Sequence, residues 1–209
     1  MGLKKEVVQY AKMCFDNGLT IGTTGNVSVR KEDVMYITPS ALPYNEMEES
    51  DILAVDINSG EIIAGHRNPS SETQMHRFIY LKDNNIGAIV HTHSTYATIF
   101  ACAQMPIPPI HYTIADIGRE VPVAPYARYG SEKLAINVVE TLGENNGVLL
   151  ANHGVVAVGT SLADAYRRAE VIEEVAQLAH GSYTLNSVKP LTNEELDDAL
   201  EGFKSYVSG

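Results

Sequence analysis

Cysteine is scarce in this 209-residue sequence, which contains only Cys14 and Cys102. Two cysteines cannot form a disulfide framework, so the chain is not a small disulfide-stabilised scaffold. Each cysteine stands among apolar neighbours, as a small buried residue would. We therefore expect both to be buried and structural.

Long apolar runs are also missing. No segment approaches the roughly 20 apolar residues that span a bilayer. Residues 1–6 carry acidic and basic side chains and lead into an amphipathic stretch, unlike the apolar core of a signal peptide. We therefore expect a soluble, cytoplasmic protein without membrane contact.

Basic residues are outnumbered, with 15 Lys and Arg against 26 Asp and Glu, and the formal net charge is −11. A nucleic-acid surface needs clustered Lys and Arg, and the basic residues here are scattered, so we expect no nucleic-acid partner. A small anionic ligand stays open, because backbone N–H groups at a helix N-terminus can hold a phosphate without much positive charge.

With 44% hydrophobic residues, the chain is long enough to bury one sizeable core, and we expect residues 1–209 to form a single domain. The periodicity predicts helices over residues 3–15, 96–103, 131–142 and 161–179, and two further helices that begin at residues 70 and 192. It predicts strands over residues 27–30, 34–37, 53–56, 61–64, 88–93 and 147–151. Early strands followed by helices that flank later strands predict an α/β fold, a three-layer α/β/α sandwich with a mostly antiparallel or mixed central sheet.

Two helix starts carry the pattern of a capping box, in which a hydroxyl side chain and an acidic or amide side chain three residues later cap each other's backbone N–H groups. Ser71 with Gln74 matches this pattern, and so does Thr192 with Glu195. We expect each pair to begin a helix.

Three histidines stand at the ends of predicted strands. His91 and His93 are two residues apart, so on a strand they project from the same face with Cα atoms roughly 6–7 Å apart. His153 directly follows the apolar strand at 148–151, where α/β folds often place functional groups. Three imidazoles with an open fourth position are typical of a catalytic zinc site. The alternative is a pair of hydrogen-bonded core histidines and a loop histidine.

Two further segments suit a phosphate. Ser70, Ser71 and Glu72 open a helix, where hydroxyls and free N–H groups can bind an anion, although the same residues often serve only as caps. Residues 22–28 form a Gly/Thr/Asn loop before a strand. Its backbone N–H groups could hold a phosphate, or the loop could be an ordinary turn.

Taken together, these segments resemble the class II aldolase/adducin family. The matching segments, in order, are residues 22–28, 38–40, 70–72, 91–93, 111–115 and 152–154. The resemblance extends from about residue 3 to residue 180, and it implies a metal-dependent enzyme that acts on a sugar phosphate. Within the family the chain is most similar to the L-fuculose-1-phosphate aldolase branch.

The resemblance also implies roles for individual residues. It implies one Zn²⁺ per subunit, with another divalent metal as the alternative, bound by His91, His93 and His153 and completed by Glu72, which turns into the catalytic base when substrate displaces it. It implies that Tyr112 protonates the aldehyde oxygen. The implied substrate- and phosphate-binding residues are Gly25, Asn26, Ser40, Ala41, Ser70 and Ser71.

The chemistry of aldol cleavage agrees with this set. Cleavage of a ketose 1-phosphate to dihydroxyacetone phosphate and an aldehyde passes through an enediolate, which a divalent cation stabilises as a Lewis acid. A carboxylate such as Glu72, once released from the metal and held in a partly dry pocket, can act as base, and we expect desolvation to raise its pKa in that state. A phenol such as Tyr112 can supply a proton.

Several alternatives stay open. L-ribulose-5-phosphate 4-epimerases of the family have Asp where this chain has Glu72, but methylthioribulose-1-phosphate dehydratases share the Glu. A non-catalytic binding module of the adducin type and a metal hydrolase are further alternatives. Ala41 stands where aldolases of this branch commonly have Gly, which puts the substrate stereochemistry in doubt.

The resemblance further implies a homotetramer with each site at a subunit boundary. Tyr112 would then reach the site of the neighbouring chain. Tyr206 matches a tyrosine in the C-terminal tail of the aldolases.

Overall fold

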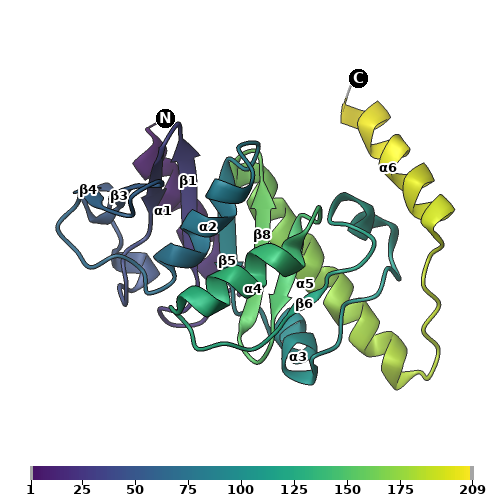
Figure 1. The fold of residues 1–209 in the computed structure, drawn as a ribbon. Coiled ribbons are helices and arrows are strands. Elements are labelled where there is room, and N and C mark those ends of the chain that lie inside the picture. The colour runs from purple at the N-terminus through teal and green to yellow at the C-terminus, as the bar shows by residue number, and fades with distance from the viewer. Residues whose placement is uncertain (1, 208–209) are drawn as a thin grey trace.

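The computed structural model describes residues 2–207, and of residues 204–207 only the backbone. Its centre is an eight-stranded sheet (Figure 1). Across the sheet the strands are β4 (Ile62–Ala64), β3 (Leu53–Asp56), β2 (Val34–Ile37), β1 (Asn26–Lys31), β5 (Ala88–Thr92), β8 (Gly154–Gly159), β7 (Gly147–Leu150) and β6 (Val123–Ala124). Neighbouring strands are antiparallel except β6 and β7, which are parallel.

Helices cover both faces of the sheet. One face packs against α2 (Thr73–Lys82) and α4 (Glu132–Leu142). The other packs against α1 (Leu3–Asp16), α3 (Thr95–Ala103) and α5 (Leu162–Thr184). Short 3₁₀ turns are η1 (Tyr44–Glu46), η2 (Glu49–Asp51) and η3 (Tyr112–Asp116), and α6 (Asn193–Val207) follows α5. The predicted α/β/α sandwich with a mostly antiparallel sheet is confirmed.

The central strands are buried on both faces, because helices lie above and below them. Along β5, Val90 belongs to the core under α1, α3 and α5, whereas Ile89 belongs to the core under α2 and α4. Side chains alternate along a strand, so His91 shares the face of Ile89 and is directed toward the α2 layer. The same alternation directs Asn26 and Ser28 of β1 away from Val27, toward α2.

One predicted capping box forms and the other does not. Thr192 Oγ1 accepts from the N–H of Glu195 at 3.2 Å, and Glu195 Oε2 accepts from the N–H of Thr192 at 2.8 Å. At the start of α2, however, the helix begins at Thr73, and Ser70 Oγ accepts from the N–H of Glu72 at 3.2 Å. The prediction that Ser71 pairs with Gln74 was therefore wrong, because the chain makes a turn at 70–73 before the helix starts.

Cys14 is buried in α1, as predicted, but Cys102 is exposed near the end of α3. The expectation that Cys102 is a buried residue was wrong, because its apolar neighbours in the sequence occupy the core-facing side of the same helix. Ala97, Phe100 and Ala101 take those positions.

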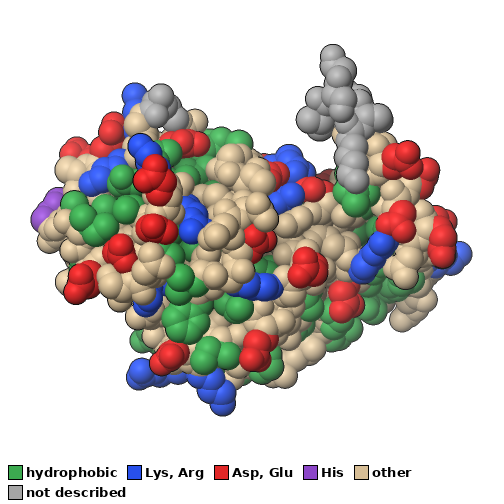
Figure 2. All heavy atoms as spheres, turned by 45° about the horizontal axis from the view of Figure 1, so that its top comes forward, with side chains coloured by type: hydrophobic (Ala, Val, Ile, Leu, Met, Phe, Trp, Pro, Cys, Tyr) green, Lys and Arg blue, Asp and Glu red, His purple; other side chains and the backbone are tan. Residues whose placement is uncertain are grey.

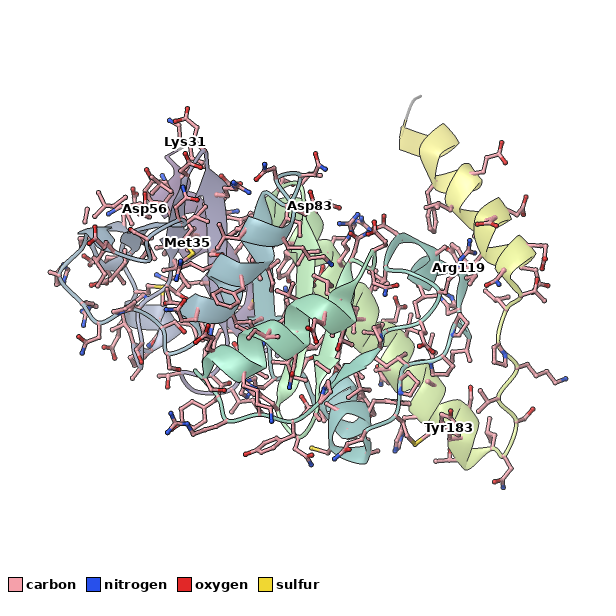
Figure 3. All side chains as sticks on the ribbon, viewed as in Figure 1. Lys31, Met35, Asp56, Asp83, Arg119 and Tyr183 are labelled. Atoms are coloured by element: carbon pink, nitrogen blue, oxygen red, sulfur yellow. The ribbon has the colours of Figure 1, made fainter. Side chains whose placement is uncertain are left out.

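The C-terminal helix α6 lies at one end of the molecule (Figure 1). Arg119 attaches it to the body: its Nη2 donates to Asp197 at 2.5 Å and its Nη1 to the carbonyl of Asn193 at 2.9 Å (Figure 3). Acidic side chains gather over this end of the visible face, and acidic and basic side chains intermingle elsewhere (Figure 2). Within the described residues, no helix combines the length and the apolar character that crossing a membrane requires.

Candidate metal centre and active site

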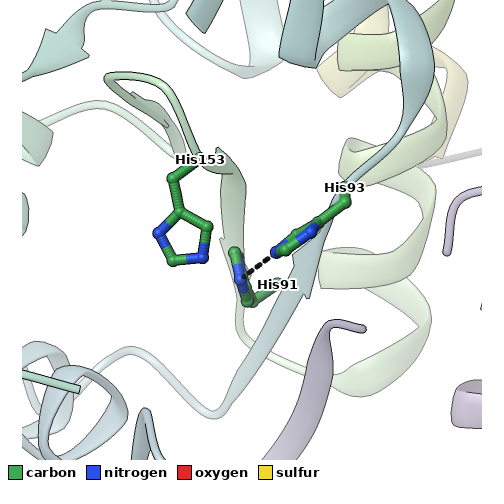
Figure 4. A group of neighbouring side chains, drawn as sticks. All are labelled: His91, His93 and His153. Carbon is green, nitrogen blue, oxygen red and sulfur yellow. Dashed lines mark hydrogen bonds between the residues drawn. The ribbon is translucent and has the colours of Figure 1, made fainter. Parts of the chain in front are cut away.

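Two neighbouring strands bring the three histidines together. His91 lies in β5 and His93 just beyond its end, while His153 lies in the turn between β7 and β8. Because β5 pairs with β8, this turn lies beside the end of β5. The ring centroids are 4.9–5.0 Å apart, and ligand nitrogens from all three lie within 4.8 Å of one another (Figure 4).

Glu72 reaches this cluster from the start of α2. Its Oε2 is 2.9 Å from His91 Nε2, and its Oε1 is 3.3 Å from His153 Nε2. The carboxylate is buried, since the residue is only 5% exposed, and it also accepts a hydrogen bond from Asn26 Nδ2 at 2.9 Å. The structure thus brings together all four residues predicted to bind metal.

The geometry of this cluster fits a divalent cation. His91 Nδ1 donates to the carbonyl of Val155 at 2.9 Å, which leaves Nε2 directed at the cluster. His93 Nε2 faces His91 Nε2 at 3.2 Å. Glu72 Oε1 is buried and has no hydrogen-bond partner within the described part of the chain. Converging imidazole nitrogens and an unpartnered carboxylate oxygen are the donors that Zn²⁺ prefers.

The charges in the cluster affect one another. Burial raises the pKa of Glu72, but the charge and hydrogen bond of His91, with His153 and Asn26, outweigh burial and hold the pKa of Glu72 below its usual value. The expected rise of the Glu72 pKa concerns the carboxylate after its release from the metal, and it stays a prediction. Burial lowers the pKa of His93 to about 3 and that of His153 to about 4. Both rings are neutral at pH 7, the form that binds metals.

Gly154 makes room for the cluster. A Cβ atom at this position would lie 2.4 Å from the carbonyl oxygen of Thr92 and 2.9 Å from Cδ2 of His93. Real Cβ atoms do not approach backbone oxygens so closely, so only glycine allows the start of β8 to pack beside Thr92 and His93.

The loops predicted to hold a phosphate meet at the same end of the sheet. The N–H of Thr38 donates to the carbonyl of Val27 at 3.1 Å, and the N–H of Ser40 donates to the carbonyl of Asn68 at 3.0 Å. These contacts align three loops. The first contains Gly25 and Asn26, the second Ser40 and Ala41, and the third Ser70 and Ser71. Gly25 and Ala41 both have a positive φ, of +78° and +55°, and Ser70 is buried while Ser71 is exposed.

Tyr112 lies in η3 and is 52% exposed. Its described ring contacts are with His111, at 4.7 Å, and with Phe203 of α6, at 5.8 Å. Tyr112 therefore has no described ring contact with His91, His93 or His153 of its own chain. The side chain of Tyr206 lies outside the described residues.

A pocket of about 280 Å³ opens beside the histidines. Besides His93 and His153, its walls include Tyr126 and Tyr129, whose rings are 62% and 67% exposed. Sequence reasoning did not find these tyrosines, because a loop with two tyrosines has no periodicity or chemical pattern that marks a pocket.

His76 is a third residue that sequence reasoning missed. It lies one helical turn after Glu72, is fully buried, and its Nε2 is 2.6 Å from Asn26 Oδ1. Burial lowers its pKa to about 3, so the ring is neutral. A histidine four residues after a predicted catalytic residue, between the apolar Met75 and Ile79, was a signal that could have found it.

Known proteins share this fold and sequence. Residues 5–180 match the model of the "Class II Aldolase and Adducin N-terminal domain" family. A 5-deoxy-D-ribulose 1-phosphate aldolase of Bacillus thuringiensis serovar kurstaki is 37% identical over 205 residues, which cover 97% of this chain and 96% of the relative. An L-fuculose phosphate aldolase of Escherichia coli O6:H1 is 39% identical over 191 residues, which cover 90% and 88%.

A solved structure of an L-fuculose 1-phosphate aldolase is similar to this chain with a TM-score of 0.94 and 40% identity, and the match covers 97% of this chain and 96% of that one. The eight-stranded, mostly antiparallel sheet with its flanking helices is thus the fold of a class II aldolase. Family model, relatives and fold agree over nearly the whole chain, and the chain belongs to the class II aldolase/adducin family.

Proposed function

We propose that this chain is a zinc-dependent aldolase that cleaves a ketose 1-phosphate, of the L-fuculose 1-phosphate type, to dihydroxyacetone phosphate and an aldehyde. The observation that carries this proposal is the buried carboxylate of Glu72 between two imidazoles, with Oε2 2.9 Å from His91 and Oε1 3.3 Å from His153. A buried carboxylate beside three imidazoles supports the proposal, because the cleavage needs both a base and a cation.

His91, His93 and His153 would hold the Zn²⁺ of each subunit, with Glu72 completing the set until substrate replaces it. When bound, the cation supplies Lewis-acid stabilisation of the negative charge that develops on the enediolate. Other divalent metals could serve, because neutral imidazoles accept several.

Glu72 would take the proton from the substrate hydroxyl whose oxygen becomes the aldehyde oxygen. The carboxylate suits this role because it is buried beside the imidazoles and because Oε1 has no hydrogen-bond partner within the described part of the chain, which leaves that oxygen free to take a proton. Asn26 holds the other oxygen, Oε2, at 2.9 Å and limits rotation of the carboxylate.

The phosphate group would lie among the three aligned loops. We assign its contacts to Gly25, Asn26, Ser40, Ala41, Ser70 and Ser71. The Asn26 side chain already donates to Glu72 and accepts from His76, so its second Nδ2 hydrogen is the side-chain group left for a phosphate. The positive φ of Gly25 and Ala41 tilts consecutive peptide groups as in an anion-binding nest.

We also propose that residues 1–209 form one cytoplasmic domain that assembles into a homotetramer with sites at subunit boundaries. Tyr112 is exposed, and its described ring contacts are with His111 and Phe203 and not with His91, His93 or His153. It would act in the site of a neighbouring subunit as the proton donor to the aldehyde oxygen in the condensation direction. In cleavage, the proton that Glu72 takes from that oxygen would pass to the enediolate carbon.

The test is a product assay on the purified, zinc-loaded protein. The substrates are L-fuculose 1-phosphate, 5-deoxy-D-ribulose 1-phosphate, methylthioribulose 1-phosphate and L-ribulose 5-phosphate. The proposal expects dihydroxyacetone phosphate from a ketose 1-phosphate. A dehydrated product would instead establish a dehydratase, and an epimer would establish a 4-epimerase.

A second measurement separates the enzyme from a non-catalytic binding module of the adducin type. Elemental analysis of protein purified without chelator should find about one divalent metal per chain. Glu72→Gln should keep that metal and lose cleavage, because an amide cannot take the proton. Glu170→Gln is the matched control, since Glu170 accepts from Tyr166 at 2.8 Å on α5 and has no contact with the cluster. Full activity of Glu72→Gln would remove Glu72 as the base.

A further inference from the structure

A row of buried polar groups leads from the candidate active site along the underside of α2. Tyr80 OH is 2.8 Å from Ser28 Oγ, which is 2.7 Å from His76 Nδ1. His76 Nε2 is 2.6 Å from Asn26 Oδ1, and Asn26 Nδ2 is 2.9 Å from Glu72 Oε2. Every residue of this row is at most 5% exposed, so water does not replace any of these contacts.

The row forms because the repeats of a helix and a strand nearly match. Glu72, His76 and Tyr80 are four residues apart on α2, where four residues rise about 6 Å. Asn26 and Ser28 are two residues apart on β1, where two residues rise about 6.6 Å. Polar side chains on one face of the helix therefore alternate along the row with polar side chains on the facing side of the strand.

The carboxylate sets the direction of every hydrogen bond in the row. Glu72 Oε2 can only accept, so the amide of Asn26 must turn its NH₂ toward Glu72 and its oxygen toward His76. His76 Nε2 must then donate to Asn26 Oδ1, and in the neutral ring Nδ1 must accept from Ser28. Ser28 in turn accepts from the hydroxyl of Tyr80. All four hydrogen bonds point toward Glu72.

We infer that His76 is a positioning residue for the reaction: it fixes the amide of Asn26, which in turn holds the Glu72 carboxylate in the orientation that the chemistry needs. The inference rests on the proposed role of Glu72. A purely structural role explains the row less well, because five contiguous polar side chains in a core cost desolvation that apolar side chains of similar volume would avoid.

The expected effects differ along the row. His76→Leu removes the donor to Asn26, and kcat should fall about tenfold, since a hydrogen bond contributes up to a factor of that order. KM should change by a smaller factor than kcat, because Asn26 is only one of six residues assigned to the phosphate, whereas it holds the single proposed base. Tyr80→Phe removes only the far donor and should lower kcat by about two- to threefold.

His76→Gln is the rescue variant, because its Nε2 amide can donate to Asn26 Oδ1. Its kcat should recover to within about threefold of the parent. Ile79→Ala is the matched control, since Ile79 is a fully buried apolar residue of the same helix. It should lower the Tm and leave kcat unchanged. Elemental analysis should find the metal retained in all four variants.

Either of two results would overturn the inference. One is a kcat for His76→Leu within twofold of the parent, and the other is a kcat loss in Ile79→Ala as large as in His76→Leu. A readout independent of activity is the crystal structure of zinc-loaded His76→Leu, in which the Asn26 amide should rotate away from Glu72. An unchanged Asn26 position would contradict the inference, whatever the parent protein cleaves. A parent protein that cleaves no ketose phosphate would refute only the proposed function.

Discussion

Gly25 lies directly against the backbone of His91. A Cβ atom at position 25 would be 2.6 Å from the carbonyl oxygen of His91, and the φ of Gly25 is +78°. The loop before β1 therefore touches the strand that carries the first candidate metal ligand, and only glycine fits both the contact and the conformation.

Gly25→Ala should accordingly affect both stability and metal binding. A left-handed backbone costs about 1–2 kcal/mol for alanine and the close contact about 1–3 kcal/mol more, so the free energy of unfolding should fall by about 3 kcal/mol. Gly22→Ala is the matched control, because Gly22 also has a positive φ, +64°, but nothing within 4 Å of its Cβ position. It should lose only about 1 kcal/mol in a urea titration and keep its metal. An equal loss of unfolding free energy in both variants would show that the close contact of Gly25 with the His91 carbonyl does not contribute.

Removal of single histidines should separate metal binding from stability. His91→Ala and His93→Ala should both reduce the bound metal to a small fraction per chain. In chelated protein only His91→Ala should also lower the free energy of unfolding, by about 1–3 kcal/mol, because it removes a fully buried side chain and its hydrogen bond to the carbonyl of Val155. His66→Ala, at an exposed histidine near Asp51, should retain the metal. Metal retention in His93→Ala would exclude His93 as a ligand.

Tyr112 can be tested by subunit mixing. Tyr112→Phe should lower kcat about a hundredfold through loss of the proton donor. When Tyr112→Phe and His93→Ala subunits are co-assembled in equal amounts, about a quarter of the sites in a symmetric oligomer regain both groups, and activity should return accordingly. Mixing His91→Ala with His93→Ala should restore nothing. If Tyr112 acts within its own chain, the first mixture also stays inactive.

The pH dependence of stability should reveal the contact between η3 and α5. Asp116 accepts from Arg168 Nε at 2.9 Å and Nη2 at 3.1 Å, and from Arg167 Nη2 at 2.6 Å. Burial raises the pKa of Asp116, but the two arginines outweigh burial and lower it. A lowered pKa stabilises the folded state above the ordinary carboxyl pKa of about 4 and ceases to do so as the pH falls through the lowered value.

Asp116→Asn should therefore cost about 2 kcal/mol at pH 7 in chelated protein, and the difference from the parent should shrink below about pH 4. Denaturant titrations at pH 7 and pH 3 measure both quantities. The exposed pair of Arg119 and Asp197 provides the control, and Asp197→Asn should change stability by less than about 1 kcal/mol. A difference that is the same at both pH values would show that Asp116 contributes through packing and not through its charge.

Periodicity was sufficient to predict most of the layers, because apolar spacing reflects burial directly. The strand at 88–93 and the helix at 131–142 correspond to β5 and α4 within a residue or so. β8 was not predicted, although Gly154–Gly159 is a continuous apolar run, because it follows β7 after a short turn that contains His153. From the sequence alone, the first of these two apolar runs reads as a strand and the second can be a loop. The pairing of β8 with β5 is what identifies the second run as a strand.

The candidate site was predictable where chemistry and spacing coincide. His91 and His93 are two residues apart on one strand, and Glu72 opens a helix, so residue type and position both pointed to them. His76 was missed although its spacing of four residues from Glu72 was a signal, because its contact with Asn26 depends on the alignment of α2 over β1. The outward position of Cys102 likewise depends on how α3 is rotated against α5, and the apolar sequence around it is compatible with either side.

The candidate ligands also come from distant parts of the chain. Glu72 starts α2, His91 lies in β5, and His153 lies in a turn that reaches β5 only after β7 and β8 have paired with the sheet. Closing such long loops costs entropy, so an unfolded chain offers a cation little more than His91 and His93. The full ligand set exists only once the central strands have assembled. A bound cation should therefore slow the unfolding of the finished sheet and leave its folding rate almost unchanged.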